Sequence, residues 1–486
     1  MRAPSSYMRA LFLTALCTAC AAPVLTPSED AGFRYHAPDV ATGPRLRVPV
    51  VRHTTLANGL SVISIESPES ETIRMAFASR VASDSSEASA GVATLTAFAM
   101  RSGTLMPDGQ VERSPELLGE SIDVVSFGSG TEFRLAALPS EAAQAIGLLA
   151  RLIQNPTLDA EALRRARSLA EARNAAEASQ AFRGLSRMAA EALFGHENPF
   201  GHFTFGSAEE RSAIADDAVR RFYASRYQPQ ESALLILGPL STPQDLALAQ
   251  ASFGSWRPAQ MASTFREPEF AVTPPDRRPS SIVVLAPERT ANLVVLMPCP
   301  RRDSPETFAG DLTATLVGRL WSVGLNRRFR HDSGTSYLTS AECLQSRSGG
   351  VFKIVLDSEP SELSATLATI QEQLATLADS PPAESELADA RALYLGRRAI
   401  DYSTGAGLHA MLVEQFINGL PADYSAQLEA RINAVTAQDI QTFVHRYLSP
   451  QNRVVAVEGA KRELAEPVTH LGNTIWKSST QAERGE

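Results

Sequence analysis

The sequence predicts an α+β fold built from two tandem homologous domains, each a mixed sheet with helices on one face. The first observation is an internal repeat, because segments of the first half recur in the same order in the second half. The repeated pairs are Gly91 with Gly310 (310 minus 91, an offset of 219), 133–138 with 352–356, and 222–238 with 443–459. The second observation is the length of 486 residues, which exceeds what one compact core usually holds. Together they indicate a duplicated fold.

Each copy has the same predicted order of elements: strand, strand, helix, edge strand, long helical segment, helix and final strand. Apolar residues at helical spacing predict amphipathic helices over 142–153 and 363–377, and Pro156 and Pro381 break the pattern after each of them. A sheet of few strands buries its apolar face by packing helices against it, which is the α+β layer expected in each half.

The first regular structure is expected at 52–66, where Asn58 and Gly59 predict a hairpin turn before an alternating strand. Proline-rich stretches without apolar periodicity separate the parts of the chain. The expected segments are a signal segment at 1–20, a tether at 21–50, the first domain at 51–256, a linker at 257–281, the second domain at 282–468 and a tail at 469–486.

Composition excludes one class of partner. A formal net charge of -9 disfavours nucleic acid, whose binding proteins present basic surfaces. The apolar content of 44% and charged content of 20% are typical of a globular protein and identify no function by themselves.

The first twenty residues predict export. Arg2 and Arg9 precede the apolar run 10–16, which is too short for a membrane-spanning helix and is typical of a secretory signal. The run leads into small residues before Cys20, which resembles a bacterial lipoprotein box and implies lipidation of Cys20; plain cleavage after a nearby small residue is the alternative. Lipidation would place the protein on the cell envelope, at the outer membrane facing the periplasm, held to the membrane only through its lipid anchor.

The mature chain would keep two cysteines, Cys299 and Cys343. They could pair in an oxidising compartment, but their spacing does not show it. We expect two buried free thiols and leave the pairing open.

The run from Gly91 to Thr104 carries the most information about function. Its frame of Gly, Ala, Met, Gly and Thr resembles the inverted zinc motif of the pitrilysin/insulinase/mitochondrial-processing-peptidase family of metallopeptidases. The resemblance extends over roughly 52–468, and it implies a clam-shell half with two such domains. Thr94, Ala97 and Phe98 stand where the family has its two histidines and glutamate.

Those three substitutions remove the chemistry. Two histidines four residues apart grip one zinc ion from the same helix face, and a glutamate between them activates the bound water. A threonine, an alanine and a phenylalanine do neither, so this chain is expected to bind no metal. In the family a third carboxylate ligand follows about seventy residues later, and Glu171 falls in that register. It is either a relict ligand or a solvated helix carboxylate.

The second copy retains family residues. The segment 325–337 resembles the family's Arg and Tyr segment, which reaches from the C-terminal domain to the zinc site, and the resemblance assigns those roles to Arg330 and Tyr337. An arginine offers fixed donors to a carbonyl or carboxylate, and a tyrosine hydroxyl stabilises an oxyanion. The alternative is that both are packing or surface residues.

The resemblance suggests a divided active site. We hypothesise that the chain is inactive alone and forms a heterodimer with a zinc-bearing paralogue, where Arg330 and Tyr337 act in trans and the zinc belongs to the partner. The substrate would be an extended peptide added to a sheet edge, with 128–133 as the candidate edge. The alternative is a catalytically inactive envelope lipoprotein that acts as a structural or peptide-binding scaffold. A hydrolase with an unfamiliar site has no supporting motif.

Overall fold

A computed structural model of the chain describes residues 46–478 with gaps, and all its elements belong to one unit, 44–486. The gaps are 82–90, 106–110, 113–121, 128, 179, 196–197, 199–200, 202–205, 207, 258–271, 286–290, 320–323, 335 and 337. The predictions at Cys20 and Tyr337 therefore lie outside the described residues. Among the helices that are described, none combines the length and apolar character needed to span a membrane.

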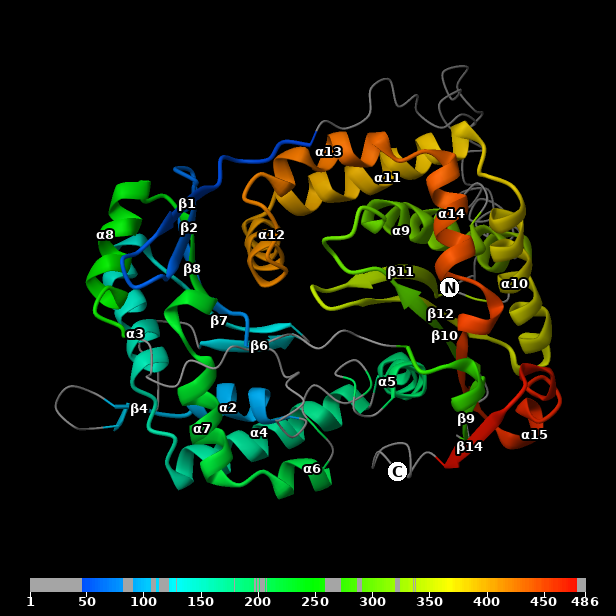
Figure 1. Ribbon diagram of the computed structural model, residues 1–486, viewed down its shortest axis with the longest axis horizontal. Helices are drawn as coiled ribbons and strands as arrows, with labels where there is room; N and C mark the ends of the chain where they lie inside the picture. The colour runs from blue at the N-terminus through cyan, green and yellow to red at the C-terminus, as the bar shows by residue number, and fades with distance from the viewer. Residues whose placement is uncertain are drawn as a thin grey trace, which may run out of the picture. The chain divides into compact units, whose positions relative to one another are not determined.

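The first half folds around a six-stranded mixed sheet (Figure 1). Its order is β1-β2-β8-β3-β7-β6, with β2 and β8 parallel and the other neighbours antiparallel. The strands are β1 (Arg52–Thr55), β2 (Ser61–Glu66), β3 (Ile73–Ser79), β6 (Asp123–Phe127), β7 (Gly130–Ala137) and β8 (Ser232–Gly238). The predicted hairpin is present, since β1 and β2 pair antiparallel across the Asn58-Gly59 turn.

The second half repeats this sheet. Its order is β14-β9-β13-β10-β12-β11, and β9 pairs parallel with both of its neighbours, β14 and β13, while the other neighbours are antiparallel. The strands are β9 (Ser281–Leu285), β10 (Ala291–Cys299), β11 (Thr339–Gln345), β12 (Gly350–Ser358), β13 (Val454–Gly459) and β14 (Thr474–Ser478). Reading β2-β8-β3-β7-β6 against β9-β13-β10-β12-β11 gives the same succession, which confirms the duplication that the sequence predicts.

One boundary prediction is wrong. The segment from residue 469 was expected to be a tail, but it contains β14, which pairs parallel with β9. The hydroxyls of Ser281, which begins β9, and Thr474, which begins β14, lie 2.7 Å apart. The second domain therefore extends to at least residue 478. A segment at the end of a domain can join the sheet as an outer strand, because it needs only the free edge of one neighbouring strand.

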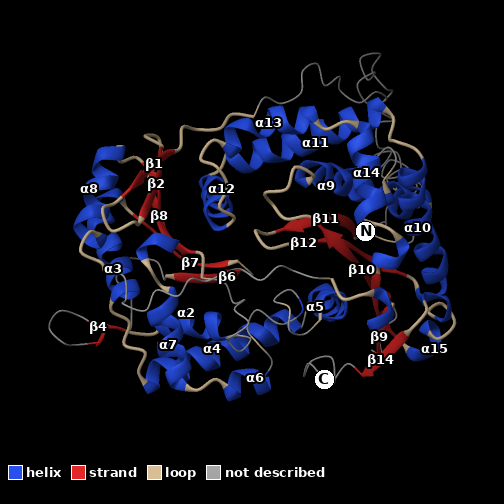
Figure 2. Ribbon diagram, viewed as in Figure 1, coloured by secondary structure: helices blue, strands red, loops and turns tan. Residues whose placement is uncertain are grey.

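Helices follow the predicted repeat as well (Figure 2). The first half carries α2 (Val92–Arg101), α3 (Ala142–Gln154), α4 (Ala160–Ala178), α5 (Ala181–Phe194), α6 (Ala208–Ala213), α7 (Asp216–Arg226) and α8 (Thr242–Phe253), with a small ribbon of β4 (Thr104–Leu105) and β5 (Val111–Glu112). The second half carries α9 (Thr307–Ala314), α10 (Leu363–Asp379), α11 (Glu384–Tyr402), α12 (Gly405–Ile417), α13 (Tyr424–Ala434), α14 (Ala437–Tyr447) and α15 (Lys461–Leu464).

One face of each sheet packs on helices of its own half, as the sequence predicts. In the first half Ile73, Met75 and Phe77 of β3 enter a core with α2, α3 and α8. Side chains at every second strand position face the same side, so the residues between them, Ala76 and Ala78, face the opposite side and enter a different cluster.

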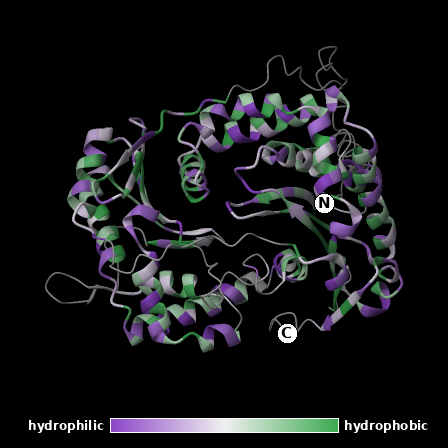
Figure 3. Ribbon diagram, viewed as in Figure 1, coloured by the Kyte–Doolittle hydropathy of each residue, from purple (hydrophilic) through white to green (hydrophobic). Residues whose placement is uncertain are grey.

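The opposite faces are covered by an exchange of helices. From the first half, α5 packs on β10 and β13, and its Leu185, Met188 and Leu193 share a cluster with Val294 and Leu296 of the second sheet. In return, α12 of the second half packs on β3 and β8 of the first sheet. Both helices carry apolar side chains along their length (Figure 3). Each half therefore completes the other's core.

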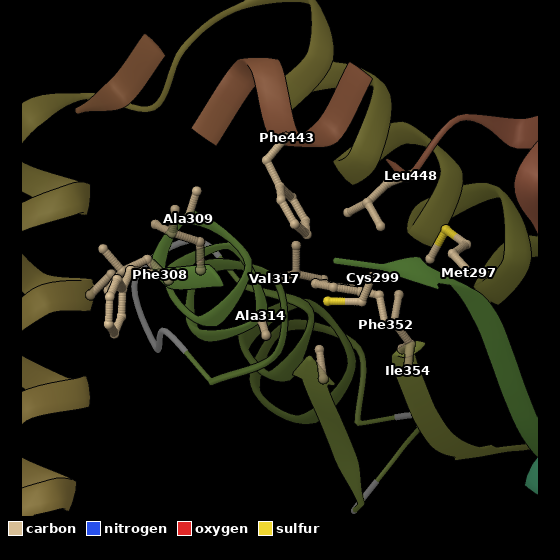
Figure 4. Packing of buried hydrophobic residues seen from close by; sticks show 14 of the residues in the cluster. Met297, Cys299, Phe308, Ala309, Ala314, Val317, Phe352, Ile354, Phe443 and Leu448 are labelled. Carbon is tan, nitrogen blue, oxygen red and sulfur yellow. The ribbon is translucent and has the colours of Figure 1, made fainter. Parts of the chain in front are cut away.

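The core of the second half holds a disulfide. Cys299 of β10 and Cys343 of β11 are bonded, with their Cα atoms 6.3 Å apart, so the expectation of free thiols is wrong. Met297, Phe352 and Phe443 pack around them (Figure 4). The bond links cysteines 44 residues apart in sequence on two strands, β10 and β11, that pair with opposite edges of β12.

The repeat matches Gly91 to Gly310, but the structural reason for a glycine differs between the two positions. Gly91 caps α2 with a left-handed backbone, φ 86°, which disfavours a side chain. Gly310 lies inside α9, where a Cβ would come within 2.8 Å of Cys343 Sγ and 2.9 Å of the Phe443 ring.

Candidate functional site: the degenerate metal helix and the inter-half pocket

The helix expected to resemble a zinc helix is α2, and its ligand positions belong to the hydrophobic core. Thr94 and Ala97 are fully buried and Phe98 is 2% exposed. The helix is held at its end by Ser102 Oγ, which donates to Phe98 O at 2.7 Å, and by Arg101 Nε, which donates to Ile122 O at 2.6 Å. No imidazole or carboxylate stands at these positions, so these residues do not fit a zinc ion.

Glu171, which falls in the register of the family's third metal ligand, lies on α4, the helix that packs against α2. It is exposed. Its carboxylate acts electrostatically on Arg211 of α6: burial lowers the pKa of that guanidinium, and Glu171, Glu209 and Glu210 oppose the shift. In the described parts of the chain, no group of three or more His, Cys, Asp or Glu residues could hold a metal ion.

Arg330 lies in a short π-helix, η8 (Arg327–Asp332), and is exposed. Its neighbour Phe329 is buried and anchors the segment in the second core. The residue after the gap at 335 is Ser336, whose hydroxyl donates to Asp357 Oδ1 of β12 at 2.8 Å. These contacts hold Phe329 and Ser336 in the second half, and Tyr337 lies outside the described residues.

The expected peptide-binding edge at 128–133 is wrong, because β7 is an interior strand. It pairs with β3 on one side and with β6 on the other. The outermost strand on this side is β6, at 123–127, and it ends next to a pocket that sequence reasoning missed.

This pocket, named here the inter-half pocket, has a volume of about 410 Å³ and is lined by both halves. The first half contributes Val125, Ser129, Glu132 and Arg134 from β6, β7 and their turn. The second half contributes residues at the end of β11 and along α12: Gln345, Ser346, Ala406, His409, Ala410, Val413, Glu414, Ile417 and the C-cap Asn418.

A buried hydrogen-bonded pair of side chains, one from each half, lies in the wall of the inter-half pocket. His409 Nε2 and Glu132 Oε1 share a hydrogen bond, and the two residues are 9% and 2% exposed. A carboxylate only accepts, so Nε2 carries the proton. Their separation of 277 residues explains why no local pattern could reveal the pair.

Behind the pocket lies a second set of buried charges. Arg302 donates to Glu414 at 2.9 Å and to Asp311 at 3.1 Å, and Tyr394 donates to Asp311 at 2.8 Å. Burial by itself would raise the pKa of Glu414, but Arg302 and Arg398 outweigh it and hold that pKa below its usual value. Glu414 is therefore a carboxylate whose charge is already compensated by arginines.

Comparison with known proteins finds similarity to one group of peptidases. The family model of the peptidase M16 inactive domain matches residues 213–394. The β subunit of mitochondrial-processing peptidase from Pongo abelii is 22% identical over 457 residues, covering 91% of this chain and 91% of that protein. The chain is similar to M16 peptidases in sequence, and it lacks their zinc-binding residues in α2.

Solved structures of similar proteins show the same fold. The M16 inactive domain protein from Pseudomonas fluorescens superposes with a TM-score of 0.73 at 20% identity, over 84% of this chain and 98% of the other. A protease from Helicobacter pylori gives 0.75 at 14% identity, over 85% and 100%. The predicted resemblance and the tandem α+β fold are thereby confirmed, and the chain is a peptidase-like protein without the catalytic motif.

Proposed function

We propose that this chain is a non-catalytic subunit that pairs with a zinc-bearing paralogue in peptide hydrolysis. The observation that carries the proposal is the contrast between the two copies. The ligand positions of α2 have become apolar core, while the second copy keeps an exposed Arg330 on an anchored segment. The similar mitochondrial protein is itself a β subunit, which makes assembly with another chain a reasonable expectation.

In this proposal Arg330 and Tyr337 complete the partner's active site. The guanidinium would hold a peptide carbonyl or carboxylate, and the phenol would donate to the oxyanion of the tetrahedral intermediate. An extended peptide would pair with the outer strand β6, since the unpaired backbone of an outer strand accepts another strand.

The test compares turnover of an extended peptide by the zinc-bearing paralogue alone and with this chain added. We expect the mixture to be faster, and Arg330→Ala to reduce its kcat about 100-fold, as loss of one transition-state donor does. Arg462→Ala is the matched control, because that arginine is 90% exposed and lies on α15, far along the chain from η8. Equal rates for the paralogue alone and the mixture would refute the pairing.

A second candidate function is a peptide-binding scaffold, which the inter-half pocket beside β6 favours. A scaffold would retain its partner and its peptide in the Arg330→Ala variant, with no change in any turnover. Co-purification measured together with kcat therefore separates the two functions.

We also propose that Cys20 is lipidated and anchors the mature protein at the outer membrane facing the periplasm. The proposal is supported by the apolar run at 10–16 and the small residues before Cys20. Cys20→Ala should move the protein from the membrane fraction to the soluble fraction. A variant that still sediments with membranes would contradict the anchor.

A further inference from the structure

The inter-half pocket contains polar groups that lack partners. Ser129 and Asn418 are 3% and 8% exposed. Ser129 Oγ and Asn418 Oδ1 have no hydrogen-bond partner in the part of the chain that the structure describes. A buried polar atom without a partner costs about 1–3 kcal/mol, so two of them lining one cavity point to a bound group that supplies hydrogen bonds.

The charges around the pocket leave one carboxylate to be matched. Glu414 is compensated by Arg302, and Arg134 at the rim donates to Asp123 at 2.7 Å. Within the described residues, Glu132 has one hydrogen-bond partner, His409, which contacts one of its two carboxylate oxygens. The second carboxylate oxygen is left to accept another hydrogen bond. A buried carboxylate whose neighbours can accept hydrogen bonds favours a ligand that is positively charged and donates hydrogen bonds.

The remaining walls are apolar. Val125, Val413 and Ile417 line the cavity from both halves, and Ala406 and Ala410 line it from the earlier turns of α12. A volume of about 410 Å³ is within the range of small-ligand sites, which are mostly apolar with a few placed polar groups.

We propose that the inter-half pocket binds a protonated amine or guanidinium on a short apolar stem, with Glu132 as its charge partner. The cation sits against Glu132, its remaining N–H groups reach Ser129 Oγ and Asn418 Oδ1, and the stem packs on the valines and Ile417. The cation can belong to a free small amine or to a basic side chain of a peptide. This binding goes beyond the proposed function, since it needs neither zinc nor a second subunit.

The test is calorimetric titration of the full mature chain with n-pentylamine, using pentanoate and 1-pentanol as probes of matched length. We expect the amine to bind and the two other probes to bind at least about tenfold more weakly. Acetylated pentapeptides with one lysine, or norleucine in its place, identify the source: a lysine peptide that binds tighter than the free amine assigns a peptide ligand, and the reverse order assigns a small amine.

Variants locate the site. Glu132→Gln keeps the shape and the contact with His409 and should weaken the amine at least tenfold, while Glu71→Gln, at an exposed position outside the pocket, should not. Ala410→Phe fills the cavity from an exposed wall of α12 and should abolish binding with an unchanged unfolding midpoint. The absence of amine binding, equal binding of pentanoate, or full affinity in Glu132→Gln would overturn the proposal.

Discussion

The exchange of α5 and α12 predicts that a mutation in one half weakens the sheet of the other. Leu193 of α5 is fully buried and belongs to the cluster formed with β9, β10, β12 and β13 of the second sheet. Truncating a buried leucine to alanine costs about 2–5 kcal/mol, because transfer energy is lost and a cavity remains. For Leu193→Ala we expect about 3 kcal/mol, since α5 is pressed on a sheet that cannot collapse around the gap.

Native-state hydrogen exchange measures where this energy is lost. Since each 1.4 kcal/mol is a factor of ten, amides of β10 and β13 should exchange about 100-fold faster in Leu193→Ala. The matched control is Leu149→Ala on α3, an equally buried leucine in the first half's own core, which should accelerate β3 and β7 instead. Unchanged protection of β10 and β13 in Leu193→Ala would refute the exchange of helices.

Two further predictions concern buried groups of each half. Asp245 on α8 is 1% exposed, and burial, together with the charge of Glu66, raises its pKa from 3.8 to about 7. The folded chain thus keeps a proton that the unfolded chain releases, so this residue reduces the free energy of unfolding as pH rises from about 4 to 7. In urea unfolding, Asp245→Asn should be about 1–4 kcal/mol more stable than the native protein at pH 8 and equal to it at pH 3.5. A constant difference at both pH values would contradict the assignment. The Cys299–Cys343 disulfide closes a loop between cysteines 44 residues apart, which restricts the unfolded chain. The double variant Cys299→Ala/Cys343→Ala should therefore lose about 4 kcal/mol of unfolding free energy. An unchanged urea midpoint would show that the bond does not restrain the unfolded chain.

Much of the architecture could be predicted because it is written in local patterns. Helical spacing at 142–153 and 363–377 corresponds to α3 and α10, and the repeat offset locates matching strands in the two sheets. The loss of zinc binding is equally local. It follows from the side chains of Thr94, Ala97 and Phe98, which supply neither the imidazoles nor the carboxylate of the family's zinc site in any packing.

Other features were decided by the tertiary structure alone. A periodic pattern shows that a strand or helix has an apolar face, but it does not identify the element that covers that face. Hence α5 and α12 could each be predicted as helices, while their exchange between halves could not. The same reason applies to strand order, which makes β6 rather than β7 the outer strand, and to the bond between Cys299 and Cys343.

The inter-half pocket shows this limit most clearly. Glu132 lies in a strand and His409 on a helix, and neither sits in a motif, so each is an ordinary polar residue when read in sequence. They meet because α12 crosses from the second half to the first sheet, which brings residues 277 positions apart into contact. What the chain has lost could be read from its residues, whereas the pocket it has formed depends on how two copies of one fold pack together.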